Sequence, residues 1–123
     1  MNAILLSIKP AYVEKILNGT KKYEYRKRLP RKDIDIIYIY STYPEKKVVG
    51  TVKITSCLSA PPSVLWEKTK SNAGISRLKY REYFKGCKKA YAYELGAVNV
   101  FDEAKQLSDY GINVAPQSFM YIK

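Results

Sequence analysis

The chain changes from a helical to an extended pattern over eight residues, Gly19-Thr20-Lys21-Lys22-Tyr23-Glu24-Tyr25-Arg26. Before this stretch, residues 10–18 begin with a proline, which suits the first turn of a helix, and carry apolar side chains four positions apart. Gly19 can adopt the left-handed backbone conformation that ends a helix. Within the stretch, tyrosines alternate with charged residues, so the two kinds of side chain face opposite sides of a strand. We expect a helix over 10–18 and a strand directly after it.

Five further segments have the apolar, β-branched or aromatic composition of strands: residues 3–8, 34–41, 48–58, 89–101 and 119–122. Gly50 lies inside the third of them, where it indicates a bulge or a barrel corner. Two more helices are expected, one opened by Pro61-Pro62-Ser63 and one capped by Ser76 and ended by Gly86. The polar segment 102–111 is expected to include a helical turn.

The order of these elements argues against a doubly wound parallel sheet, because no strand–helix–strand unit repeats. Five or six mixed strands with two to three short helices close best as a small β-barrel. No linker, internal repeat or low-complexity tract interrupts the chain. We therefore predict the α+β class and a single domain over residues 1–123.

The composition adds a strong positive charge to a chain that can build a core. Of the 123 residues, 46% are apolar, and 22 Lys and Arg face 11 Asp and Glu, which gives a net charge of +11. Such a charge opposes compaction and favours an anionic partner, with nucleic acid the commonest and an acidic membrane surface the rival. No apolar run approaches the ~20 residues of a spanning helix, and the first eight residues lack the basic start of a signal peptide. We expect a cytoplasmic protein.

The complete absence of histidine limits the chemistry. Neither a Ser-His-Asp nor a Cys-His nucleophile can be built, and no imidazole can bind a metal. The two cysteines, Cys57 and Cys87, are too few for a structural zinc site, and we expect two buried or half-buried thiols, with a disulfide between them as the alternative. We predict no metal and no cofactor, so any catalysis must come from lysine, arginine, carboxylate or hydroxyl groups.

Basic residues gather in two runs. Seven of the twelve residues over 21–32 are Lys or Arg, and a second run spans 77–89. These runs are typical of a phosphate-binding surface, and a solvated face is the structural alternative. The two would form the walls of one cleft if they shared a face, which the sequence leaves open. The twelve tyrosines favour packing over base stacking, and Tyr40, at a strand end, is the candidate for stacking.

The opening stretch resembles the G-x-K-x-x-E-x-R signature of ASCH domains, which belong to the PUA-like superfamily. The similarity extends back through Ser7-Ile8-Lys9-Pro10 and forward to Ala115-Pro116-Gln117-Ser118-Phe119, so it covers nearly the whole chain. The resemblance implies a small β-barrel with a cleft beside the signature strand. It also implies RNA binding, often connected with the regulation of translation or transcription.

On this resemblance, Lys21 would direct its ammonium at a phosphate or a base, and Glu24 would orient Arg26 or accept from a base amino group. Gln117 and Ser118 would supply neutral donors and acceptors opposite. The structural alternative is that Glu24 and Arg26 form an ion pair inside the barrel. The candidate nucleic-acid-binding residues are Lys9, Lys21, Lys22, Glu24, Arg26, Arg28, Tyr40, Arg77, Gln117 and Ser118.

Some ASCH relatives are hydrolases that act on acetylated cytidine or on RNA. A lysine among like charges has a lowered pKa and can act as a base, so Lys21 with Ser118 or Thr20 would be the catalytic pair. The amidohydrolase relatives, however, carry threonine where Glu24 stands, and Glu82 lies at the wrong offset for their glutamate. RNA binding, regulatory in purpose, is therefore the leading interpretation. A ribonuclease or nucleoside amidohydrolase is the alternative, followed by a protein-binding role; the sequence leaves the oligomeric state open.

Overall fold

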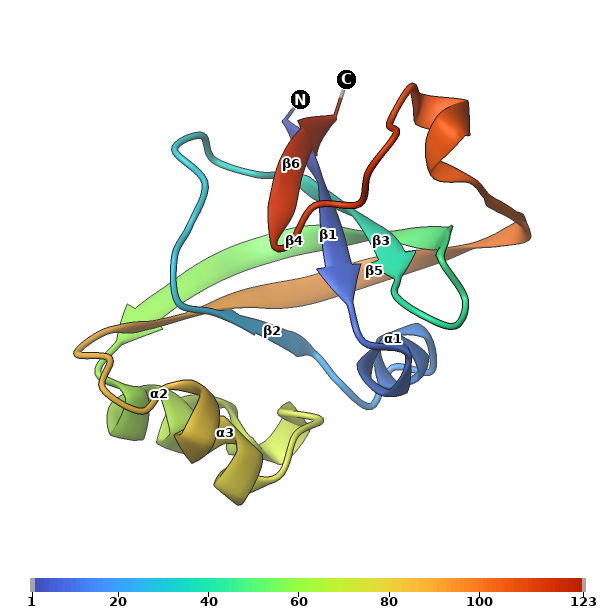
Figure 1. The fold of residues 1–123 in the computed structure, drawn as a ribbon. Coiled ribbons are helices and arrows are strands. Elements are labelled where there is room, and N and C mark those ends of the chain that lie inside the picture. The colour runs from blue at the N-terminus through green and yellow to red at the C-terminus, as the bar shows by residue number, and fades with distance from the viewer. Residues whose placement is uncertain (1, 123) are drawn as a thin grey trace.

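The computed structural model describes residues 2–122 and contains one six-stranded mixed sheet (Figure 1). The strands are β1 (Ala3–Ile8), β2 (Tyr23–Arg26), β3 (Ile36–Ser41), β4 (Lys47–Ala60), β5 (Ala90–Lys105) and β6 (Phe119–Ile122). The α-helices are α1 (Pro10–Leu17), α2 (Pro62–Thr69) and α3 (Arg77–Tyr83), and short 3-10 turns cover Lys70–Asn72 and Leu107–Tyr110. The chain therefore folds in the α+β class, as its pattern predicted.

The strands lie in the order β2-β5-β4-β3-β1-β6, and the sheet curls into a half-barrel (Figure 1). Neighbouring strands pair antiparallel except β1 and β3, which pair parallel. The mixed, barrel-like sheet is thus confirmed. β2, which carries the signature, lies at one edge of the sheet, where only β5 pairs with it.

The expected elements are present, with one difference at the end of β5. Residues 102–105 were expected in a polar segment with a helical turn, but they continue β5 because Lys105 still pairs with Val48 of β4. The turn begins only at Leu107. Gly50 marks a register shift in β4, and a Cβ there would meet the Asn99 carbonyl oxygen at 2.5 Å. Ser76 caps α3 as expected, accepting a hydrogen bond from the amide of Lys79.

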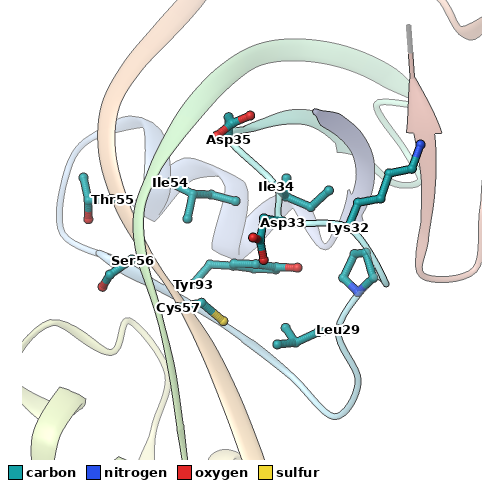
Figure 2. A pocket seen from close by; sticks show the side chains of 11 residues that line it. Leu29, Lys32, Asp33, Ile34, Asp35, Ile54, Thr55, Ser56, Cys57 and Tyr93 are labelled. Carbon is teal, nitrogen blue, oxygen red and sulfur yellow. The ribbon is translucent and has the colours of Figure 1, made fainter. Parts of the chain in front are cut away.

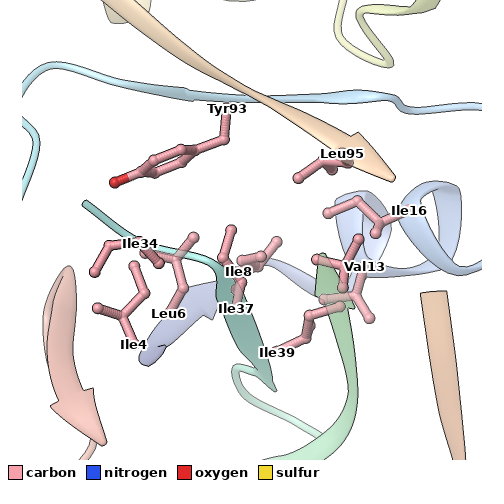
Figure 3. Packing of buried hydrophobic residues seen from close by; sticks show 11 residues of the cluster. Ile4, Leu6, Ile8, Val13, Ile16, Ile34, Ile37, Ile39, Tyr93 and Leu95 are labelled. Carbon is pink, nitrogen blue, oxygen red and sulfur yellow. The ribbon is translucent and has the colours of Figure 1, made fainter. Parts of the chain in front are cut away.

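The largest apolar cluster fills the inside of the half-barrel (Figure 3). It joins β1, α1, β3 and β5 through Ile4, Leu6, Ile8, Val13, Ile16, Ile37, Ile39, Tyr93 and Leu95. Burying each aliphatic side chain of this kind contributes about 1.5–3 kcal/mol relative to leaving it in water. This cluster holds α1 against the sheet and thereby fixes where the chain enters β2.

A second cluster packs α2 and α3 against the other face of the sheet. It contains Tyr25 of β2, Leu65 of α2, Tyr80 and Phe84 at α3, and the small residues Ala90 and Ala92 of β5. The alternation along β5 explains the division, since Ala90 and Ala92 face the helices, while Tyr93 and Leu95 face the half-barrel. The helix pair therefore lies directly beside the edge strand β2 (Figure 1).

The structure also settles the cysteines and the search for a membrane span. Both cysteines are free thiols, as expected. Cys87 is half-buried, but Cys57 is exposed, so the expectation of a buried or half-buried thiol was wrong for Cys57. Within residues 2–122, every helix is too short or too polar to cross a bilayer.

Candidate functional site

Lys21 lies at the entrance to β2 and is buried. Its amide donates to the Lys15 carbonyl at 3.0 Å, which anchors the residue to the end of α1. Only 3% of its surface is exposed, and its Nζ donates to the Ala73 carbonyl at 2.7 Å. The ammonium also lies 5.3 Å from the ring centre of Tyr12 and 4.9 Å from that of Tyr25. The cation is thus held by one carbonyl and two aromatic faces.

Burial lowers the pKa of the Lys21 ammonium below its ordinary value. The Glu24 carboxylate opposes this change, while the positive charges of Lys15 and Arg26 add to it. The expected cause, crowding by like charges, is therefore secondary to the loss of hydration. A lysine in this state gives up its proton more readily than a surface lysine.

Gly74 lets the loop after α2 close on Lys21. Its φ of +67° lies in the left-handed region, and an added Cβ would meet the Lys21 Cβ at 2.4 Å and Cγ at 2.5 Å. Any larger residue would push against the lysine side chain. Next to this contact, the amide of Lys22 donates to the Asn72 carbonyl at 2.9 Å.

Glu24 and Arg26 form an ion pair on the other face of β2. The Arg26 Nε and Nη2 both donate to Glu24 Oε2, at 3.1 and 2.6 Å. The side chains are 15% (Arg26) and 9% (Glu24) exposed. Arg26 Nη2 also donates to the Ser7 carbonyl at 3.2 Å, so the arginine links the edge strand β2 to β1. Glu24 and Arg26 thus form the ion pair inside the half-barrel that was the structural alternative, and the role of the pair toward a ligand stays a prediction.

Ser7 also connects this pair to the last segment before β6. Its hydroxyl donates to the Pro116 carbonyl at 2.7 Å, and its amide donates to the Ser118 carbonyl at 3.2 Å. Gln117 and Ser118 are exposed on this segment. The fold thus brings residues from opposite ends of the chain to Ser7, with Arg26 on one side and residues 116–118 on the other.

The remaining candidates are distributed around the cluster formed by Ser7, Lys21, Glu24 and Arg26. Lys9, Lys22, Arg28 and Arg77 are exposed, with Lys9 just before α1 and Arg77 at the start of α3. Tyr40 does not join them. It is only 5% exposed and packs with Leu5 and Val48, so its ring is covered by the core rather than offered to a base.

The two basic runs meet beside β2. Lys27, which follows β2, places its Nζ 4.8 Å from the ring centre of Tyr83 in α3. The first run therefore touches the helix that carries the second. The runs are neighbours in space although about fifty residues separate them in the chain.

Several residues of the cluster carry no signal in the sequence. The Tyr25 hydroxyl donates to Thr69 Oγ1 at 2.6 Å, and Thr69 donates onward to the Leu65 carbonyl at 2.8 Å. Burial raises the pKa of Tyr25 to about 12, against the opposing effect of the hydrogen bond to Thr69. The alternation along β2 predicted that Tyr25 would pack, but its contact with Lys21 and the role of Ala73 depend on the loop after α2.

In residues 2–122, the side chains of Cys, Asp and Glu form no group of three able to hold a metal ion.

An edge strand with a Lys-Glu-Arg cluster, on a curled half-barrel flanked by short helices, defines a small domain of the PUA-like superfamily. The chain belongs to the ASCH domain family, whose sequence model matches residues 6–101.

Two relatives each share part of their length with this chain. An ASCH domain-containing ribonuclease of Zymomonas mobilis is 33% identical over 92 residues, which covers 74% of this chain and 62% of that protein. The large ribosomal subunit protein uL22 of Ureaplasma parvum is 28% identical over 121 residues, which covers 98% of this chain and 39% of that protein. The chain thus spans less than two thirds of the length of each.

Solved structures agree with this assignment. ASCH from Zymomonas mobilis superimposes with a TM-score of 0.90 at 29% identity, over 98% of this chain and 87% of that one. A Tyr-to-Phe mutant of the same protein gives a TM-score of 0.91 at 26% identity, over 100% of this chain and 91% of that one.

Proposed function

We propose that this chain binds RNA along the basic surface where the first run (residues 21–32) meets the second (residues 77–89). The contact between Lys27 and the Tyr83 ring carries the proposal, because it brings a cation of the first run against the helix that carries the second. A net charge of +11 and a relative named as a ribonuclease support the same conclusion.

The exposed and the buried cations have different tasks in this proposal. Lys22, Lys27 and Arg28 are exposed and would neutralise phosphates, releasing bound counterions. Arg26 is fixed by Glu24 and by the Ser7 carbonyl through Nε and Nη2, which leaves its Nη1 group to meet a ligand. Lys21 would act at the inner end of this surface, and Gln117 and Ser118 would contribute from the last segment, which Ser7 links to Arg26.

Salt dependence tests the proposal. The affinity for a labelled single-stranded RNA should fall with salt, with a log–log slope of about −0.7 for each phosphate contacted. Replacing Lys22 or Arg28 by glutamine should make the slope less steep by about 0.7 each. Lys105→Gln is the matched control, because Lys105 is exposed where β5 pairs with Val48, away from β2. A flat salt response, or equal effects at all three positions, would refute the proposed surface.

Cleavage of the bound RNA is the second candidate function. The lowered pKa of Lys21 favours it, since a neutral amine can accept the proton of a ribose 2′-hydroxyl as that oxygen attacks the neighbouring phosphorus. The bond from phosphorus to the 5′-oxygen of the next nucleotide would break, which leaves a 2′,3′-cyclic phosphate, and the departing 5′-oxygen would take a proton from water. Ser118 would donate a hydrogen bond to the phosphate. The Ala73 carbonyl and the flanking rings would hold the amine in place.

A turnover assay separates the two functions. Lys21→Ala should abolish cleavage of labelled RNA and leave most of the binding, whereas Lys22→Ala should weaken binding and leave cleavage at saturating RNA. Labelled RNA that stays intact during prolonged incubation with the wild-type protein would eliminate the ribonuclease. Binding without cleavage is the outcome that fits a regulatory role.

A further inference from the structure

A cavity of about 290 Å³ opens between the loop that follows β2 and the middle of β4 and β5 (Figure 2). Residues 29–35 of the loop form one wall, except for Arg31, and residues 54–57 of β4 form the other. Tyr93 of β5 lies across the inner end. Tyr93 pairs with Glu24 in the sheet, so the cavity lies next to the signature strand. Its size suits one small ligand.

The Tyr93 hydroxyl has no hydrogen-bond partner among the residues that the structure describes. Tyr93 is only 4% exposed, and Figure 2 shows its ring lying in the cavity with the hydroxyl directed at the loop. A buried polar group without a partner is costly and rare in folded proteins. Burial also raises the pKa of this hydroxyl, so it keeps its proton and can donate.

Most other polar side chains that line the cavity already interact with groups of the protein itself. Thr55 and Ser56 donate their hydroxyl hydrogens to Glu94, and an Asp35 carboxylate oxygen accepts from the Asn2 amide. The Lys32 ammonium lies 5.4 Å from the ring centre of Tyr121 and points away from the cavity (Figure 2).

Two functional groups are left to meet a ligand beside the Tyr93 hydroxyl. The Asp33 carboxylate accepts no hydrogen bond from any other described residue and faces the cavity in Figure 2. The Cys57 thiol has a raised pKa because of burial and of the nearby Asp33 charge, so it stays uncharged. Two carboxylates, Asp33 and Asp35, therefore give this cavity a negative character inside a strongly basic protein.

These groups select a particular kind of ligand. The carboxylates repel a phosphate, and an ionised carboxylate can only accept hydrogen bonds. The Tyr93 hydroxyl needs a hydrogen-bond acceptor on the ligand. Apolar surface for a flat ring comes from Leu29, Pro30, Ile34 and Ile54. Among the RNA bases, guanine presents two adjacent N–H donors, which can pair with both oxygens of a carboxylate, next to a carbonyl acceptor.

We propose that this cavity binds the base of a guanosine, with Asp33 accepting from its two N–H groups and Tyr93 donating to its carbonyl oxygen. The inference rests on the proposed function, since Lys27, Arg28 and Arg31 belong to the same loop, are exposed and do not line the cavity, so they could hold the phosphates of an RNA strand whose base enters it. The same chemistry would also accept a free guanosine, and the test separates the two sources.

The experiment compares single-stranded oligonucleotides that are identical except for one central residue, which is guanosine, inosine or adenosine. Inosine lacks one of the two N–H groups, so it isolates the contact with Asp33. Free guanosine and inosine form a second arm. The variants are Tyr93→Phe and Asp33→Asn, and the matched control is Tyr110→Phe, a half-buried tyrosine of the third core cluster. Tyr93→Phe removes an unpaired hydroxyl and Asp33 is exposed, so both variants should fold.

The guanosine oligonucleotide should bind about tenfold more tightly than the inosine one, because inosine would leave one oxygen of the Asp33 carboxylate without a partner once the base covers it. Tyr93→Phe and Asp33→Asn should each remove most of the preference for guanosine over adenosine, and Tyr110→Phe should keep it. All should retain the salt slope. Preference in the free-nucleoside arm as well would identify guanosine itself as a ligand, and preference in the oligonucleotide arm alone would identify a base within RNA.

Two negative outcomes are distinct. Salt-dependent binding with no preference among the three oligonucleotides, or a preference that both variants retain, would overturn the guanine pocket and leave the RNA surface standing. Absence of salt-dependent binding to every oligonucleotide would overturn the proposed function, and with it the inference.

Discussion

Replacing Gly74 by alanine should destabilise the protein considerably more than the same change at Gly86. Both glycines have a left-handed backbone, with φ of +67° and +82°. The added methyl group would lie 2.4 Å from the Lys21 Cβ at position 74, whereas nothing lies within 4 Å of it at position 86. The two changes therefore share the backbone cost and differ only in the contact with Lys21.

The magnitude follows from these two contributions. Forcing an alanine into the left-handed region costs about 1–2 kcal/mol, which is all that Gly86→Ala should lose. Gly74→Ala must in addition displace the Lys21 side chain from a packed position, and overpacking of this kind costs about 1–3 kcal/mol. We expect a total of about 2–5 kcal/mol for Gly74→Ala. Alanine restricts the unfolded chain equally in both variants, so this effect cancels in the comparison.

Urea unfolding, followed by the fluorescence of the single tryptophan, Trp66, measures both variants. A double-mutant cycle with Lys21→Ala adds a direct readout, because this variant removes the contacts with Lys21 Cγ and Cδ, at 2.5 and 2.9 Å, but keeps the Cβ, and should therefore recover part of the extra loss at Gly74. The packing described for Lys21 and Gly74 is wrong if Gly74→Ala and Gly86→Ala lose the same free energy, or if Lys21→Ala recovers nothing.

Three further predictions concern the same cluster. The unfolding free energy of the wild type should rise relative to that of Lys21→Met as the pH increases from the lowered pKa of Lys21 toward 10.5. In that pH range the unfolded lysine binds a proton that the folded one has released. Urea titrations that give a constant difference between the two proteins across this range would contradict the prediction. Arg26→Met should lower the unfolding free energy by about 3 kcal/mol, because it leaves the Glu24 carboxylate buried without its partner. Adding Glu24→Gln should recover part of that loss in thermal unfolding, whereas purely additive losses would argue against the ion pair. Tyr25→Phe should cost about 1 kcal/mol by removing the hydrogen bond to Thr69, and the spectroscopic titration of tyrosine should lose its component near pH 12; a titration curve of unchanged shape would count against this assignment.

The local pattern of the chain was enough to predict most of the fold. Alternation along residues 23–26, the proline at the start of α1 and the serine before α3 each act over a few residues. The family could be inferred from the signature for the same reason, because its glycine, lysine, glutamate and arginine occupy one turn and one strand. The sequence did not predict that β5 continues through residues 102–105. The length of that strand depends on pairing with β4, here between Lys105 and Val48, which the local pattern does not show.

The sequence was enough to predict which residues belong to the candidate site, but not how deeply they are buried or which groups they contact. Lys21 and Arg26 were named from the signature, yet nothing local indicates that Lys21 would be buried or that Arg26 would bind the Ser7 carbonyl. Tyr40 was placed among them because it ends a strand, and the third core cluster covers it instead.

What the amino-acid sequence determined by itself is the set of elements, the excess of positive charge and the family, since each depends on spacing along the chain or on simple composition. Only the tertiary structure decided which groups meet. The Lys21 ammonium binds a carbonyl 52 residues away, and Tyr93 reaches a loop from another part of the sheet. Burial and partners change the pKa of a side chain and its capacity to bind, and both are set by contacts between residues that are distant in the chain.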